Sequence, residues 1–202
     1  MKTSIVKALQ KEYSYAEYRK LIVDLLQEDK VTGIEQSEDL LNYSALNETR
    51  MHRLDKTIAI SDENIVLLQS LKNNYIWLVL SEGWCGDAAQ ILPVLNKMAL
   101  ASSGKIELKI VLRDENEELM NLFLTNGSKS VPKLIVLEKA SLNVEANWGP
   151  RPLGAVHLIQ DYKEKHGRID ETVKTDLQLW YLHDKGISTQ NEMMHLMLDL
   201  ER

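Results

Sequence analysis

The sequence contains only one cysteine, Cys85, among its 202 residues. A single thiol cannot form an internal disulfide, and a chain without disulfides is typical of a reducing compartment. No run of residues approaches the roughly 18 apolar residues that a transmembrane helix requires. The first ten residues also lack the long apolar segment of a secretory signal. We therefore expect a soluble, cytoplasmic protein that does not associate with membranes.

Basic residues are in the minority, with 24 Lys and Arg against 30 Asp and Glu and a formal net charge of −6. They are scattered and form no stripe interleaved with aromatic residues, which is the pattern of a nucleic-acid-binding surface. The nine glycines are dispersed, so there is no Gly-rich phosphate loop, and the five histidines do not have the spacing of a helical zinc motif. The sequence therefore predicts no nucleic-acid binding, no metal site and no bound cofactor.

The first 73 residues have the pattern of helices. Apolar residues recur at helical spacing from 15 to 26, and Gly33 ends this stretch. Ser37 and Ser61 then occupy positions typical of helix N-caps. This part of the chain is expected to form a helical extension.

The pattern changes at Tyr75. A short apolar run that begins there is rich in β-forming residues, which indicates a strand buried on both faces. The expected strands are 75–80, 106–112, 133–137 and 141–148, and the expected helices between and after them are 86–101, 114–127 and 153–166. The resulting order, β-α-β-α-β-β-α, predicts a mixed central sheet with helices on both faces.

Two helix starts are assigned to capping boxes, in which Asp114 precedes Glu117 and Thr189 precedes Glu192 by three residues. The second of these starts the last helix, which carries a methionine-rich stripe expected to face the core. The expected organisation is thus a helical N-terminal extension (1–73), an α/β domain (74–167) and C-terminal helices packed on it (168–202).

Three features surround the cysteine. The run Trp84-Cys85-Gly86 follows the buried strand, Pro93 lies eight residues after the cysteine, and Val131-Pro132 directly precedes a strand. Together these features resemble the thioredoxin-like superfamily over residues 75–166. The chain is similar to bacterial members in which Trp-Cys-Gly-Asp-Ala replaces Trp-Cys-Gly-Pro-Cys. The resemblance implies the three-layer thioredoxin-like α/β fold, with a cis peptide bond before Pro132.

The position of Cys85 has opposing effects on its thiol. Free backbone N–H groups and the positive end of the dipole at a helix N-terminus favour the thiolate, which is the nucleophilic form. Asp87, in the first helical turn, carries a like charge that disfavours the thiolate. The sequence therefore leaves the direction of the pKa shift open, and Cys85 is either a reactive thiol or a small buried apolar residue.

Two positions depart from thioredoxin. Ala88 stands where the family has its second cysteine, and Val79 stands where it has a buried aspartate used in proton transfer. Without a second sulfur, a mixed disulfide on Cys85 has to be released by an external thiol.

The resemblance also implies a substrate groove around the cysteine. Trp84 would shield one side of the thiol, and Arg151 would reach Cys85, Asp87 or a carboxylate of the substrate. The implied groove residues are Trp84, Gly86, Asp87, Val131, Pro132, Gly149 and Arg151.

Two functions are consistent with these residues. In the first, Cys85 is the catalytic residue of a thiol redox protein that exchanges mixed disulfides with a protein or a small-molecule thiol or disulfide. In the second, the groove binds a peptide or protein partner without turnover, and the terminal helices set its geometry.

Overall fold

The computed structural model describes all residues from Met1 to Arg202. The N-terminal helices are α1 (Lys2–Leu9), α2 (Tyr15–Gln27), α3 (Glu38–Thr57) and α4 (Asp62–Gln69). The central elements are β1 (Tyr75–Ser81), α5 (Gly86–Ala101), β2 (Ile106–Leu112), α6 (Glu117–Met120), β3 (Lys133–Glu138), β4 (Val144–Trp148) and α7 (Leu153–His166). The chain ends with α8 (Glu171–Asp184) and α9 (Ile187–Leu200).

The four strands form one mixed sheet in the order β2-β1-β3-β4. β1 pairs with β2 in parallel and with β3 antiparallel, and β3 and β4 form the antiparallel hairpin. Every residue of β1 is buried, as its continuous apolar run predicts. The predicted α/β class with a mixed central sheet is confirmed.

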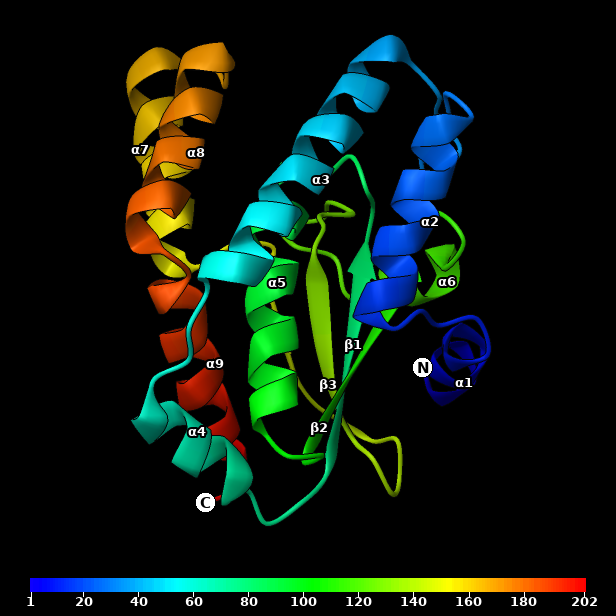
Figure 1. Cartoon of the computed structure of the whole chain (residues 1–202), viewed down its shortest axis with the longest axis vertical. Coiled ribbons are helices and arrows are strands. Elements are labelled where there is room, and N and C mark those ends of the chain that lie inside the picture. The colour runs from blue at the N-terminus through cyan, green and yellow to red at the C-terminus, as the bar shows by residue number, and fades with distance from the viewer.

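Helices cover both faces of the sheet. Figure 1 shows the sheet nearly edge-on, with α4, α5 and α9 on one side and α1, α2 and α6 on the other. α5 packs against α3, α4 and α9, while α1 and α2 contact β2. The three layers place the N-terminus of α5 directly after β1, at the end of the sheet where α3 and α8 also converge.

One continuous core joins the three parts of the chain. Tyr18 of α2, Met51 of α3 and Met197 of α9 belong to the same buried cluster as Trp77 of β1. The methionine stripe of the last helix faces this core, since Met193, Met194 and Met197 are all buried. None of the helices combines the length and apolar character needed to span a bilayer.

The predicted helix 114–127 is wrong. α6 contains only Glu117–Met120, and its N-cap is Asn116 rather than Asp114. The Asp114 carboxylate instead accepts hydrogen bonds from the backbone N–H of Ile34, at 3.2 Å, and from Arg113, at 2.7 Å. A tertiary partner 80 residues away in sequence thus replaced the local capping interaction.

The predicted capping box at the last helix is also wrong. α9 begins at Ile187 after Gly186, which has a left-handed φ of 78°, and Thr189 is buried inside the helix. The Glu192 carboxylate accepts hydrogen bonds from Trp148 Nε1 and from the backbone N–H of Leu153, both at 2.7 Å. Glu192 therefore joins the end of β4 to the start of α7.

Candidate functional site

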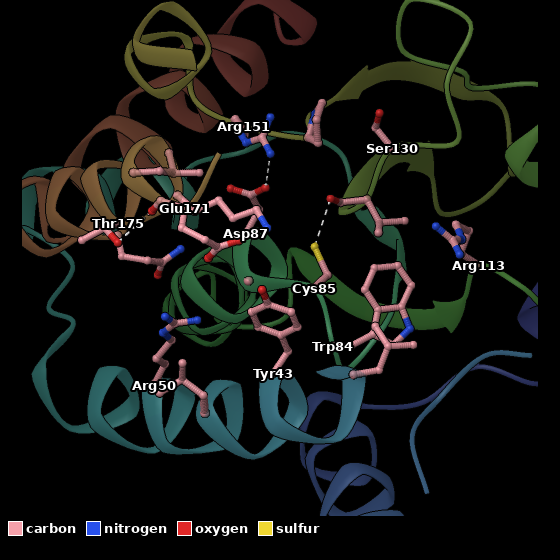
Figure 2. Close-up of a pocket in the computed structure, with 18 of the residues that line it drawn as sticks. Tyr43, Arg50, Trp84, Cys85, Asp87, Arg113, Ser130, Arg151, Glu171 and Thr175 are labelled. Carbon is pink, nitrogen blue, oxygen red and sulfur yellow. Dashed lines mark hydrogen bonds and ion pairs between the residues drawn. The ribbon is translucent and has the colours of Figure 1, made fainter. Parts of the chain in front are cut away.

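Cys85 is the N-cap residue of α5 and is 8% exposed. Its Sγ accepts a hydrogen bond from the backbone N–H of Ala88, at 3.5 Å. The thiol also donates to the carbonyl oxygen of Val131, at 3.2 Å, the contact drawn as a dashed line in Figure 2. The sulfur is therefore held between the first turn of the helix and the segment that leads into β3.

The surroundings of Cys85 favour the protonated thiol. Burial raises its pKa to about 12, and the negative charge of Asp87 adds to the rise. The backbone N–H groups of Ala88 and Asp87 and the charge of Arg151 act in the opposite direction but are outweighed. The structure thus supplies the direction of the pKa shift that the sequence left open.

Asp87 is the centre of a buried polar cluster. Arg151 forms an ion pair with its carboxylate, with 2.7 Å between Nη2 and Oδ2, and Tyr181 donates a hydrogen bond to Oδ1 at 2.9 Å. Desolvation, followed by the charge of Asp87, raises the pKa of Tyr181 well above its ordinary value, so Tyr181 stays a hydrogen-bond donor. Arg151 was expected to contact Cys85, Asp87 or a substrate, and it pairs with Asp87.

The peptide bond between Val131 and Pro132 is cis. Gly149, at the end of β4, lies against it: a Cβ atom on Gly149 would come within 2.4 Å of the Pro132 carbonyl oxygen. Gly149 also has a left-handed φ of 109°. The backbone at this position admits only glycine without rearrangement.

A pocket of about 650 Å³ opens beside the cysteine. Pro132 and Gly149, which the resemblance places in the groove, do not line the pocket. The other five implied groove residues line it together with Cys85: Trp84, Gly86, Asp87, Val131 and Arg151. Figure 2 shows the Cys85 sulfur near the centre of this group, with Arg151 and Asp87 to one side and Trp84 to the other.

Two helices of the terminal extensions, α3 and α8, supply nearly half of the residues that line the pocket, and sequence reasoning missed them. The lining residues of α3 are Leu40, Tyr43, Leu46 and Arg50, and those of α8 are Glu171, Lys174, Thr175, Leu177 and Gln178. No local sequence signal distinguishes these residues from an ordinary helix surface. They are recognised only once the fold brings α3 and α8 to the two sides of Gly86.

Trp84 is held from the side of β2. The guanidinium of Arg113 lies 4.9 Å from its ring centroid, and Arg113 is fixed in turn by its ion pair with Asp114, at 2.7 Å. Trp84 is therefore a positioned wall of the pocket. No group of three or more His, Cys, Asp or Glu side chains is arranged to hold a metal ion.

Two solved structures align with most of this chain. A crystal structure of a protein of unknown function from Pseudomonas aeruginosa aligns with a TM-score of 0.50 and 17% identity, covering 93% of this chain and 95% of that one. A crystal structure of an HIV epitope scaffold aligns over the same shares at 17% identity, with a TM-score of 0.48. At such identity the first likeness shows the fold alone. No curated protein matches the sequence.

A family model described as thioredoxin matches residues 33–163. The match includes the whole sheet, the Cys85 corner and part of the N-terminal extension. It extends over more than half of the chain. The protein therefore belongs to the thioredoxin family.

Proposed function

We propose that the protein is a non-catalytic binding module of the thioredoxin fold, with its ligand site in the pocket beside Cys85. The observation that carries this proposal is the hydrogen bond from the Cys85 thiol to the Val131 carbonyl oxygen, at 3.2 Å. This bond requires the proton that a nucleophilic cysteine would have lost. The site thus has a wide pocket next to a sulfur that rests in its unreactive form.

Two neighbouring positions support the same conclusion. Ala88 supplies no second thiol to release a mixed disulfide, and Val79, completely buried in β1, supplies no acid or base for proton transfer. The pocket beside Cys85 has walls from α3 and α8 and a volume of about 650 Å³, which gives a ligand room next to the sulfur.

Single-thiol exchange is the second candidate, and one observation favours it. The N–H of Ala88 points at Sγ, which stabilises any thiolate that forms. In that reaction the Cys85 thiolate attacks one sulfur of a disulfide, the S–S bond breaks, and the other sulfur leaves as a thiolate. A thiolate of an external thiol then attacks the mixed disulfide and releases Cys85.

The pH dependence of Cys85 alkylation distinguishes the two functions. We expect the rate of modification by iodoacetamide, followed by mass spectrometry in the native protein, to keep rising beyond about pH 9, because folding raises the thiol pKa from 9.0 to about 12. The urea-unfolded protein serves as the control, and its rate should level off just above about pH 9. A native rate that reaches its plateau below about pH 8 would overturn the binding-module proposal in favour of thiol exchange.

A further inference from the structure

The charges that line the pocket are mostly compensated. Five cationic side chains line it, namely Arg50, Arg113, Lys129, Arg151 and Lys174. Four of them have a carboxylate partner: Arg113 pairs with Asp114, Lys129 with Glu117, Arg151 with Asp87, and Lys174 with Glu171. Arg50 is the exception, because it forms no ion pair.

Arg50 is half-buried on α3 and is held in place by neutral groups. Its Nη1 donates to Asn47 Oδ1 at 2.9 Å, and Asn47 Nδ2 donates to the Gly83 carbonyl oxygen at 3.0 Å. Asn47 is completely buried, so this link fixes the guanidinium against the loop that carries the cysteine. Desolvation and the nearby charge of Arg53 lower the pKa of Arg50, as expected for a cation that lacks an anion.

Gln178 presents a second donor from the opposite wall. Its Oε1 accepts a hydrogen bond from Gln90 Nε2 at 2.8 Å, which leaves its own Nε2 without an acceptor in the chain. A Cβ atom placed on Gly86 would lie 3.5 Å from Gln178 Nε2 and 3.6 Å from Arg50 Nη1. Donors from α8 and α3 therefore meet over the first residue of α5.

The backbone of Gly86 itself supplies a third donor. Gly86 is the first residue of α5, and its N–H forms no hydrogen bond within the chain. A guanidinium, a primary amide and a helix N-terminal N–H are all donors, and no carboxylate compensates the guanidinium. This combination matches the paired anionic oxygens of carboxylates and phosphates.

We propose that the pocket binds a small organic anion, whose carboxylate or phosphate group is held by Arg50, Gln178 and the N–H of Gly86. This inference rests on the proposed function, since it names the ligand class of the same pocket. The volume of about 650 Å³ fits a small molecule. Cys85 lies beside the bound anion and is not needed to hold it.

Chemical-shift titration of the full chain by NMR tests this inference. The probes are citrate for carboxylates, pyrophosphate for phosphates, and triethyl citrate as a neutral control with the citrate skeleton. We expect the Gly86 amide resonance to shift saturably with citrate, with pyrophosphate or with both, and not with the triester. Which of the two anions binds more tightly identifies the acidic group. Added salt should weaken the binding.

Variants locate the binding site. Arg50→Gln should raise the Kd at least about tenfold, because a hydrogen-bonded charge is lost. Gly86→Ala should also weaken binding while keeping all charges, because its Cβ would occupy the space between the donors at ordinary contact distances. Lys56→Gln, at an exposed position of the same helix, is the matched control and should change the Kd less than about twofold.

Two results would overturn the inference: no saturable shift with either anion, or equal weakening by Arg50→Gln and Lys56→Gln. Both are independent of the thiol. A protein that binds no anion but keeps an unreactive Cys85 would retain the proposed function and lose only the ligand class. A low native thiol pKa together with anion binding would overturn the proposed non-catalytic function and keep the ligand class.

Discussion

At the scale of single residues, two opposing effects act on the Cys85 thiol. The helix N-terminus favours the thiolate by only about 0.3–1 kcal/mol. A rise in pKa from 9.0 to about 12 corresponds to roughly 4 kcal/mol in favour of the thiol. Burial and Asp87 therefore outweigh the helix dipole, and a position that activates cysteine in other proteins does not do so here.

The alkaline stability of the protein should depend on Cys85. Folding raises its pKa, so the thiol stabilises the native state below the unfolded pKa and loses this contribution as the pH rises. The window runs from about pH 9 to about pH 12. Within it, the difference in unfolding free energy between wild type and Cys85→Ala should shrink by about 1.4 kcal/mol per pH unit.

Urea unfolding of both proteins at several pH values measures this difference. Folding also raises the pKa of buried tyrosines such as Tyr18 and Tyr181, which makes stability pH-dependent in the same range. These tyrosines are present in both proteins, so the comparison isolates the thiol. A difference that stays constant from roughly pH 7 to pH 10.5 would show that the native and unfolded thiols titrate alike.

Asp87→Asn should lower the native pKa of Cys85. The substitution removes the like charge beside the sulfur and leaves the positive charge of Arg151 uncompensated. We expect the alkylation profile to move to lower pH by about one unit or more. Asp176→Asn, an exposed position on α8, is the control and should leave the profile in place. An unchanged profile in Asp87→Asn would mean that burial alone sets the pKa.

At the scale of elements, the sequence predicted best where local and tertiary preferences agree. The apolar run of β1 and the caps Ser37 and Ser61 formed as expected, because no distant partner competed for them. The predictions failed where an acidic side chain found a remote donor. Asp114 accepts a hydrogen bond from Ile34, and Glu192 accepts one from Trp148. No local sequence pattern predicts either contact.

The close approach of β4 to the cis-proline segment should make Gly149 irreplaceable. Gly149→Ala combines a left-handed φ with a Cβ only 2.4 Å from the Pro132 carbonyl oxygen. Gly127→Ala shares the left-handed φ, at 77°, but has open space around it. We expect Gly127→Ala to cost about 1 kcal/mol and Gly149→Ala at least about 2 kcal/mol more. Chemical denaturation measures both, and equal losses would contradict the clash.

Asn47 should anchor α3 to the cysteine loop. Asn47→Ala leaves the Gly83 carbonyl oxygen without its donor and removes the acceptor that orients Arg50. We expect a loss of about 1–3 kcal/mol in unfolding free energy. Asn42→Ala, at an exposed position of the same helix, is the matched control. Equal stability of the two variants would show that α3 is held by its apolar contacts alone.

At the scale of the whole molecule, the extensions are structural parts of the thioredoxin domain. Tyr18 of α2 and Ser81 of β1 share a buried hydrogen bond of 3.0 Å, and Tyr13 pairs with Ile110 on the open edge of β2. The resemblance located the cysteine corner because its signals are local. It did not locate Arg50 or Gln178, because their role depends on how α3 and α8 pack around α5.

A fragment of residues 74–167 should therefore not fold cooperatively. It would expose the core surface that α2, α3 and α9 bury in the full chain. We expect weak near-ultraviolet circular dichroism and no sigmoidal urea transition, compared with the full chain as control. A cooperative transition in the fragment would show that the sheet and α5 suffice as a core.

The two walls of the pocket belong to segments far apart in the chain, and this has a mechanical consequence. A ligand held between Arg50 and Gln178 acts as a noncovalent crosslink that ties α3 to α8. Such a crosslink opposes local unfolding of α3 and α8, so that these helices unfold together with the sheet. Proteases should then cleave the α7–α8 turn faster in the free protein than in the ligand-bound protein. Resistance to cleavage at this turn therefore reports that the pocket is occupied.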